Sequence, residues 1–504
     1  MRKIRPSLPA ILAAAVMLLA FSPALSFESA PGYGEAPLRK LHVSPSGSDM
    51  DGDGSFDAPF FTPGRAAALA RPGDTIILSE GTWDLTDPVE LPPGVSLEGM
   101  GEGTVLTSST LTEELGGRYA LVRLTSPEEG VMLNGDQHIS HITFDGRGTA
   151  TQAIEIQDRH NVSVHHCVIR DFVHVGVGWR ATGITGEAMP KEFVTGGRFY
   201  DNVMRDNSFY GLDAWGNIYG RGALFCGGLR DFEICGSTII EDCRTGMNGM
   251  RGVPVKFWYY TGFTAGCRVH HNVIRRLGSP TFSTDEVGWA FALESMIHYG
   301  MEIFGNEFTG AVDLNAGRRG LCGGTDYPYA TWMHDNVFTP DPTPKEAFGG
   351  AVYEETAVIL EQRTERTLIE RNTVTGYDQA LYFNVRGGVY DFTFRDNTCT
   401  RLGGGGGGML RLDGHGTDLE IFGFTVENNL FEGEGSGFGI ILGQEMGPWI
   451  GRNVTVRGNT IKHTAFGGLV LDDYIRIDGL DVKDNVFEDT GEEVVDQGRV
   501  DRGP

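Results

Sequence analysis

DNVF at residues 335–338 contains the pattern that decides the fold: an asparagine, any residue and then an apolar residue. The pattern returns along the chain as DNVM (201–204), HNVI (271–274), GNEF (305–308), RNTV (371–374), DNTC (396–399), NNLF (428–431), GNTI (458–461) and DNVF (484–487). Cys167 and Ser237 occupy the asparagine position in two further copies, and the spacing varies from 25 residues (372 to 397) to 36 residues (336 to 372). A unit of this length must stack on its neighbours to bury its apolar face.

Short segments in which apolar and polar residues alternate follow the asparagines, for example FALES (291–295), AVDLN (311–315) and LYFNV (381–385). This alternation is typical of a β-strand with one buried face. A propeller would need four strands in each blade and a steadier period of about 40 residues or more. The repeat therefore favours an all-β solenoid, a parallel β-helix.

Successive coils of a β-helix stack about 4.8 Å apart, so asparagines at one position lie above one another. Their amides can form a ladder, and asparagine also tolerates the left-handed conformation that a tight turn needs. We therefore predict that the repeated asparagines are structural and do not take part in chemistry.

The N-terminal segment LHVSPSGSDMDGDGSFDAPFFTPGRAAALARPGDTIILSEGTW (41–83), together with the repeat, resembles the right-handed parallel β-helix superfamily of secreted polysaccharide lyases and related pectate-lyase-like proteins. The resemblance covers residues 41–490, and it is specific for the fold but weak for the reaction. It implies a single-stranded right-handed parallel β-helix with a first strand, a short capping helix at about 64–71 after Thr62-Pro63, and a strand at Thr75–Leu78. It also implies carbohydrate chemistry in a groove along one parallel sheet.

Composition narrows the choice of partner. Glycine supplies 73 of the 504 residues, about twice the usual share, which argues against a helical protein. The formal net charge is −26, and a surface this acidic repels phosphate backbones and anionic lipid headgroups. We expect neither nucleic acid nor a membrane surface as a partner, and the oligomeric state stays open.

The two ends of the chain differ from the repeat. Residues 1–26 have a basic start, an apolar run at 10–21 and a small-x-small site, Ala24-Leu25-Ser26, which together predict a secretory signal peptide. Residues 27–40 would then be a linker, 41–490 the β-helix with its cap and first coils at 41–100, and 491–504 a polar tail. We expect a secreted protein that does not insert into a membrane once the signal is removed.

The seven cysteines are an odd number without the spacing of a disulfide framework or a zinc site. We expect buried small apolar side chains, with one pair among Cys226, Cys235 and Cys243 left open.

Alignment of the strands on their asparagines separates inward from outward residues and predicts an outward polar column. It comprises Glu155, Gln157, Arg180, Asp213, Trp215, Asn248, Glu294, Asp313, Asn315, Glu361, Tyr382, Asn384, Arg411, Asp413 and Asp472. We place catalytic carboxylates at the centre of the column, where the longest insertions flank it: Asp213, Glu294, Asp313 and Glu361. Glu294 and Asp313 are expected on successive coils, offset by one outward position, with backbones about 8 Å apart. Such a pair could serve as acid and base across a glycosidic bond.

Flat rings and hydrogen-bond donors next to these carboxylates predict a sugar-binding surface. The loop at 249–263 carries several of them, and the outward column supplies the rest; the candidates are Arg251, Lys256, Trp215, Trp258, Tyr259, Tyr382 and Arg411. The leading hypothesis is an exported enzyme that hydrolyses a polysaccharide by paired carboxylates.

Two alternatives stay open. A uronate-directed lyase would use Lys256 as the base and Arg251 to neutralise the substrate carboxylate. A non-catalytic glycan-binding or surface-adhesion solenoid would use the same groove only to hold sugar.

No cofactor is expected to be required. Asp49, Asp51 and Asp53, followed by Gly54, resemble the start of a calcium loop, although Phe60 stands where its bidentate glutamate belongs. We expect either a structural calcium at this partial site or an aspartate-rich turn. The tandem histidines 165–166 and 270–271 lie three coils apart and cannot share one ion.

Overall fold

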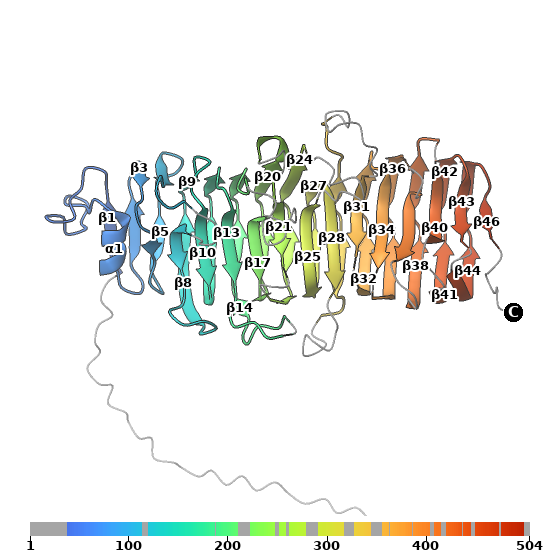
Figure 1. Ribbon diagram of the computed structural model, residues 1–504, viewed down its shortest axis with the longest axis horizontal. Helices are drawn as coiled ribbons and strands as arrows, with labels where there is room; N and C mark the ends of the chain where they lie inside the picture. The colour runs from blue at the N-terminus through green and yellow to red at the C-terminus, as the bar shows by residue number, and fades with distance from the viewer. Residues whose placement is uncertain are drawn as a thin grey trace, which may run out of the picture. The chain divides into compact units, whose positions relative to one another are not determined.

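The computed structural model describes most of the chain after residue 37 (Figure 1). The described ranges are 38–112, 119–186, 188–209, 222–246, 251–258, 262–278, 291–316, 327–343, 355–361, 363–385, 387–403, 408–414, 420–435, 437–444, 449–472 and 475–497. Arg39–Pro504 forms one compact unit. The predicted signal peptide, nearly all of the predicted linker and the last seven residues of the predicted tail lie outside the described residues.

Three parallel sheets, here called A, B and C, make up this unit, and the chain visits them in that order in every coil (Figure 1). Sheet A contains β1 (Lys40–Val43), β2 (Thr75–Leu78), β5 (Ser96–Glu98), β8 (Leu133–Ser140), β11 (Arg159–His165), β15 (Arg198–Tyr200), β19 (Glu233–Cys235), β23 (Arg268–His270), β26 (Met301–Phe304), β29 (Thr331–His334), β32 (Thr364–Glu370), β35 (Val389–Arg395), β38 (Glu420–Glu427), β41 (Trp449–Arg457) and β44 (Ile475–Lys483).

Sheet B contains β3 (Gly81–Asp84), β6 (Thr104–Thr107), β9 (Thr143–Asp145), β12 (Val168–Arg170), β16 (Val203–Arg205), β20 (Thr238–Asp242), β24 (Val273–Leu277), β27 (Glu307–Thr309), β30 (Val337–Phe338), β33 (Thr373–Thr375), β36 (Thr398–Leu402), β39 (Leu430–Gly433), β42 (Thr460–Thr464) and β45 (Val486–Thr490). A short 3-10 helix, η1 (Cys243–Thr245), follows β20.

Sheet C contains β4 (Val89–Glu90), β7 (Ala120–Leu124), β10 (Gln152–Gln157), β13 (Val175–Arg180), β17 (Gly222–Gly227), β21 (Val253–Phe257), β25 (Phe291–Tyr299), β28 (Ala311–Ala316), β31 (Thr356–Leu360), β34 (Gln379–Val385), β37 (Leu410–Gly414), β40 (Phe438–Gln444), β43 (Gly467–Leu471) and β46 (Val494–Asp496). A short side ladder of β14 (Val194–Thr195), β18 (Leu229–Arg230) and β22 (Thr264–Ala265) joins this sheet at β25. These stacked parallel sheets confirm the predicted all-β solenoid, a right-handed parallel β-helix.

Alternation along each strand divides its side chains between the inside and the outside of the coil. In β28, Val312 and Leu314 are fully buried in the main apolar core, whereas Asp313 and Asn315 lie on the opposite face. The inward residues of the three sheets form one continuous core along the solenoid. Each coil therefore buries its apolar face only because its neighbours cover it.

The asparagine ladder is confirmed. It runs through the turns between sheets A and B, where the Asn306 side-chain amide donates to Asn336 Oδ1 at 2.9 Å and Asn336 donates to Asn372 Oδ1 at 2.9 Å. Each asparagine also donates to a backbone carbonyl, as Asn336 does to Ile303 at 2.9 Å. The amides thus satisfy the buried backbone of the turns.

One part of the turn prediction was wrong. The left-handed residue is the one before the asparagine, as in Asp335 (φ 56°) and Asp396 (φ 55°), or a glycine such as Gly305 (φ 64°). The asparagine itself must point inward to reach its neighbours, so the turn is made one position earlier.

The N-terminal cap matches the expectation from residues 41–83. Helix α1 (Pro63–Leu69) begins after Thr62, whose hydroxyl accepts from the Arg65 amide at 3.2 Å, and Pro63 occupies the first turn. Ala66 and Ala67 are its buried contacts with the first coil. The helix ends two residues before the predicted boundary at 71.

At the other end, β46 pairs with β43 beyond the expected boundary at residue 490. Val494 lies opposite Leu469, so the apolar residues of the predicted tail continue the ladder.

The six cysteines in the described part of the chain are free, so the structure does not pair Cys226, Cys235 and Cys243, while Cys322 lies outside that part. No helix in the described ranges is long and apolar enough to cross a membrane.

Candidate functional site

One row of outward residues crosses the middle of sheet C, one residue from each strand. The register pairs Lys256 with Glu294, Glu294 with Asp313, and Asp313 with Ile359, and continues to Tyr382 and Arg411. Glu294 and Asp313 are thus direct neighbours, about 4.8 Å apart along the backbone. The predicted offset of one outward position was wrong, because β25 contains register shifts between Phe291 and Leu293 and between Met296 and His298.

Lys256 and Glu294 form a buried ion pair in this row. The Lys256 ammonium lies 2.7 Å from Glu294 Oε2, and the exposed side-chain fractions are 0% and 7%. The same ammonium lies 4.1 Å from the centre of the Trp258 ring. The lysine ammonium is therefore already paired inside the protein with a carboxylate and with an aromatic face.

Asp313 is the carboxyl group with the strongest perturbation in the row. It is fully buried, and burial together with the nearby Glu361 and Glu294 carboxylates raises its pKa well above the usual range. The Asn315 amide, which donates to both Asp313 oxygens at 3.1 Å, acts in the opposite direction. The position of Asp313 therefore favours a protonated carboxyl group at neutral pH.

Asn315 is fixed by contacts on both sides. Its carbonyl oxygen accepts from the Glu361 backbone amide at 3.1 Å, and its amide nitrogen also contacts Met296 Sδ at 3.0 Å. Asn315 thus links Asp313, to which it donates, with the backbone of the half-buried Glu361, from which it accepts. Sequence alternation places Asn315 on the outward face, but its link between the two acids needs the fold.

Two small apolar clusters outside the main core surround the acids. One contains Val253, Phe291, Ala311 and Ile359, and the other contains Val175, Phe225 and Trp258 with Met296 packed against it. Ile359 of the first cluster lies opposite Asp313, and Phe291 and Ala311 begin the strands that carry Glu294 and Asp313, so apolar side chains are neighbours of the acids along the sheet.

Tyr382 and Arg411 continue the row and lie next to each other. The Arg411 guanidinium lies 5.1 Å from the centre of the Tyr382 ring, and its Nη2 donates to Asp413 Oδ2 at 2.6 Å. The Tyr382 hydroxyl also donates to Asp413, at 3.4 Å.

Arg251 does not join this row. It is 4% exposed, and its guanidinium donates to the Asp242 carbonyl at 3.0 Å and to Thr245 Oγ1 at 2.9 Å. Its nearest carboxylate is Asp206, at 3.5 Å, so Arg251 and Lys256 are held by different carboxylates. Three further candidates, Asp213, Trp215 and Tyr259, lie outside the described residues.

The three aspartates of the predicted calcium loop hold turns near helix α1. Asp49 accepts from the Phe61 and Thr62 amides, both at 2.9 Å, and Asp53 accepts from the Ser55 amide at 2.9 Å. Asp51 lies beside Ser48. These hydrogen bonds are typical of aspartates that stabilise turns.

Among the described residues, the ligand atoms that converge are those of Glu233, Cys235 and His270 on sheet A. Glu233 already binds two cations, with Arg198 Nε at 2.7 Å and Arg268 Nη2 at 2.6 Å. These two positive charges disfavour a metal ion and favour an ion-pair role. The register keeps the tandem histidines three strands apart, as expected.

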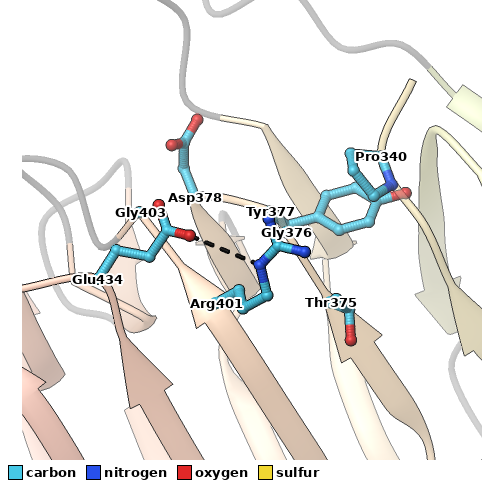
Figure 2. Close-up of a pocket in the computed structure, with 8 residues that line it drawn as sticks. All are labelled: Pro340, Thr375, Gly376, Tyr377, Asp378, Arg401, Gly403 and Glu434. Atoms are coloured by element: carbon cyan, nitrogen blue, oxygen red, sulfur yellow. Dashed lines mark ion pairs between the residues drawn. The ribbon is translucent and has the colours of Figure 1, made fainter. Parts of the chain in front are cut away.

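One surface pocket of about 280 Å³ lies where sheet B turns toward sheet C, away from the acids (Figure 2). Figure 2 shows Arg401 and Glu434 facing each other across it, 3.7 Å apart. None of the predicted site residues lines this pocket.

No protein-family model matches this chain, and no curated protein sequence does. Solved structures do resemble it. The tailspike protein of E. coli bacteriophage HK620, solved with a pentasaccharide, is 10% identical over 90% of this chain and 80% of its own, with a TM-score of 0.50. XylC with xylose is 11% identical over 89% and 86%, with a TM-score of 0.45. PfbA, a surface adhesin of Streptococcus pneumoniae, is 12% identical over 86% and 88%, with a TM-score of 0.42. In fold, this chain is a parallel β-helix protein.

Proposed function

We propose that the protein is a secreted glycoside hydrolase that cleaves an extracellular glycan on the outer face of sheet C. The observation that carries the proposal is the buried Asp313 carboxyl, whose pKa is raised by burial and by the nearby Glu361 and Glu294 carboxylates. Environments that separate the pKa values of neighbouring carboxyl groups are typical of acid and base pairs. The tailspike structure, which was solved with a pentasaccharide, supports a carbohydrate as the class of ligand.

In this mechanism Asp313 is the general acid. It donates its proton to the glycosidic oxygen as the bond from that oxygen to the anomeric carbon breaks, and the leaving sugar departs as an alcohol. Glu361 is the second carboxylate because it is half-buried and linked to Asp313 through Asn315. It removes a proton from the attacking water, and a net proton transfer back to Asp313 restores both groups.

Lys256 has a supporting role. Its ammonium lies 2.7 Å from Glu294 Oε2 and holds that side chain next to Asp313, where the Glu294 carboxylate raises the pKa of Asp313 and the Lys256 charge lowers it. Because Asp313 has no exposed surface, the mechanism also requires glycan binding to uncover it.

A panel of polysaccharides tests the proposal. The wild-type protein should release reducing ends without the ultraviolet absorbance of an unsaturated sugar. Asp313→Asn should lower kcat by about 100-fold to 10,000-fold, the usual contribution of a general acid. Glu155→Gln is the matched control, because Glu155 lies three strand steps before Lys256 on the same sheet and forms ion pairs with Arg123 and Arg180. Full activity in Asp313→Asn would contradict the mechanism.

The complete burial of Asp313 favours a second candidate, a non-catalytic glycan-binding β-helix. That protein would bind oligosaccharides and release no reducing ends. The lyase alternative has less support, since Lys256 is enclosed with Glu294 and Arg251 is bound to the turn after β20. Ultraviolet-absorbing products would favour the lyase.

The structural calcium remains a separate prediction. If calcium binds near Asp49, excess EDTA should lower the midpoint of thermal unfolding, and an unchanged midpoint would contradict it.

A further inference from the structure

Four polar side chains occupy neighbouring outward positions on β34 and β37. Tyr382 is paired with Arg411, and Asn384 with Asp413. We call these four residues the β34–β37 group. It continues the row that contains Asp313, two strand steps or about 9.6 Å farther along the sheet.

Arg411 is held in place within this group. Asp413, which is 2% exposed, accepts from it at 2.6 Å, and the guanidinium lies over the Tyr382 ring. The arginine and aspartate charges cancel, so the group is neutral overall. A guanidinium fixed in this way loses little conformational freedom when a ligand binds.

Two polar atoms of the group lack partners. The Asn384 side chain is 8% exposed, and its enclosed Oδ1 accepts no hydrogen bond from any described residue. Arg411 Nε is enclosed and likewise donates to no described residue. Folded proteins leave few buried polar atoms unpaired, because each one costs stability. An acceptor without a donor, Asn384 Oδ1, and a donor without an acceptor, Arg411 Nε, therefore lie on adjacent strands among the described residues.

We propose that the β34–β37 group is a subsite for one neutral sugar unit of the glycan. Sugar hydroxyls both donate and accept hydrogen bonds, so one sugar unit can donate to Asn384 Oδ1 and accept from Arg411 Nε. A uronate carboxylate only accepts, and it would face the Asn384 oxygen and the Asp413 carboxylate. Binding must uncover the two atoms, and the sugar then supplies the missing bonds. The inference rests on the proposed function only in that the groove holds a glycan.

Calorimetric titration of the Asp313→Asn protein tests the subsite without turnover. The probes are hexasaccharides of xylose, glucose and mannose, with hexagalacturonate as the charged comparison. We expect a neutral hexasaccharide to bind more tightly than hexagalacturonate, and Asn384→Leu to weaken that binding about tenfold or more. Gln157→Leu is the matched control, because Gln157 lies on β10, on the same outward face of sheet C as Asn384. It should leave the affinity unchanged.

The proposal is overturned if no neutral hexasaccharide binds, if hexagalacturonate binds more tightly, or if Asn384→Leu binds as well as its parent. If the wild-type protein binds a neutral hexasaccharide through Asn384 but never cleaves it, the hydrolase proposal fails and the subsite stands.

Thermal unfolding supplies an independent readout. Since Asn384 Oδ1 accepts no hydrogen bond from the described residues, Asn384→Leu should leave the unfolding midpoint unchanged or raise it. A clearly lower midpoint would mean that the amide serves folding, and it would contradict the assignment.

Discussion

Sheets A and C both carry buried carboxylates on their outer faces, but the charged residues next to these carboxylates differ. On sheet A one register position reads Arg198, Glu233, Arg268 and Glu302 on successive strands, so positive and negative charges alternate. On sheet C the corresponding row reads Lys256, Glu294, Asp313 and Ile359. Two acids are adjacent there, the cation Lys256 lies beside Glu294 alone, and the strand after Asp313 contributes the apolar Ile359.

The pKa values follow this difference. Burial alone would raise the pKa of Glu370 on sheet A, but hydrogen bonds from Arg395, Arg371 and Trp332 outweigh it and lower the pKa. For Asp313 the burial is joined by two neighbouring carboxylates, and the pKa rises. The same stacked geometry therefore gives ion-pair ladders on one face and an acid with a raised pKa on the other, depending on which residues the coils place at one register position.

The largest expected effect comes from removing the cation in each row. Lys256→Met leaves Glu294 buried and unpaired, and it should lower the free energy of unfolding at pH 7 by about 3–5 kcal/mol. Arg198→Met on sheet A removes a half-exposed partner, and Glu233 keeps Arg268, so the expected loss is about 0–1 kcal/mol. Urea unfolding measures both, and equal losses would remove the contrast between the sheets.

Asp313→Asn should change the pH dependence of stability. A carboxyl group with a raised folded-state pKa holds its proton after the unfolded chain has lost it, so it destabilises the protein as pH rises above about 4, the unfolded value. The variant should therefore be more stable than the wild type at pH 8, and the difference should vanish near pH 4. A variant that is less stable at pH 8 would contradict a protonated Asp313.

Glu370→Gln should show the opposite pH dependence. A lowered folded-state pKa contributes stability that is present above the unfolded pKa and is lost as pH falls through the folded pKa. We expect the variant to be about 1–2 kcal/mol less stable at pH 7, with the difference disappearing in acid. Unfolding curves at pH 7 and pH 3 measure it, and a difference that persists at pH 3 with equal size would contradict an ion-pair origin.

The smallest effect is expected for Asn315→Ala. It removes two hydrogen bonds that favour ionised Asp313, so the pKa of Asp313 should rise further. In the proposed hydrolase, the alkaline limb of the kcat profile should move upward in pH while kcat itself falls. A fall in kcat without movement of the limb would mean that Asn315 only supports the fold.

Sequence patterns were sufficient for the fold because its determinants are local and repeated. Thr62-Pro63 marks the start of α1, residues 75–78 form the strand expected there, and one asparagine in each coil predicts the ladder. Each signal is a short motif whose structural reason lies within one coil or its nearest neighbour.

The candidate site could be predicted only in part. Alternation places Glu294 and Asp313 on one face of neighbouring strands, but the register shifts in β25 change their offset, and no local pattern predicts such shifts. Asp313 is fully buried with Ile359 opposite it on the next strand, and such burial depends on packing between segments that are distant in sequence. Arg251 shows the converse, because it is close to Lys256 in sequence yet belongs to the turn after β20.

The most direct test of the central claim is the titration of the Asp313 carboxyl group, followed by ¹³C NMR with labelled aspartate and assigned by its loss in Asp313→Asn. We predict that Asp313 stays protonated through neutral pH while other aspartates titrate near their usual pKa of about 3.9. A signal from Asp313 that titrates at or below that value would contradict both the protonated acid and the mechanism built on it.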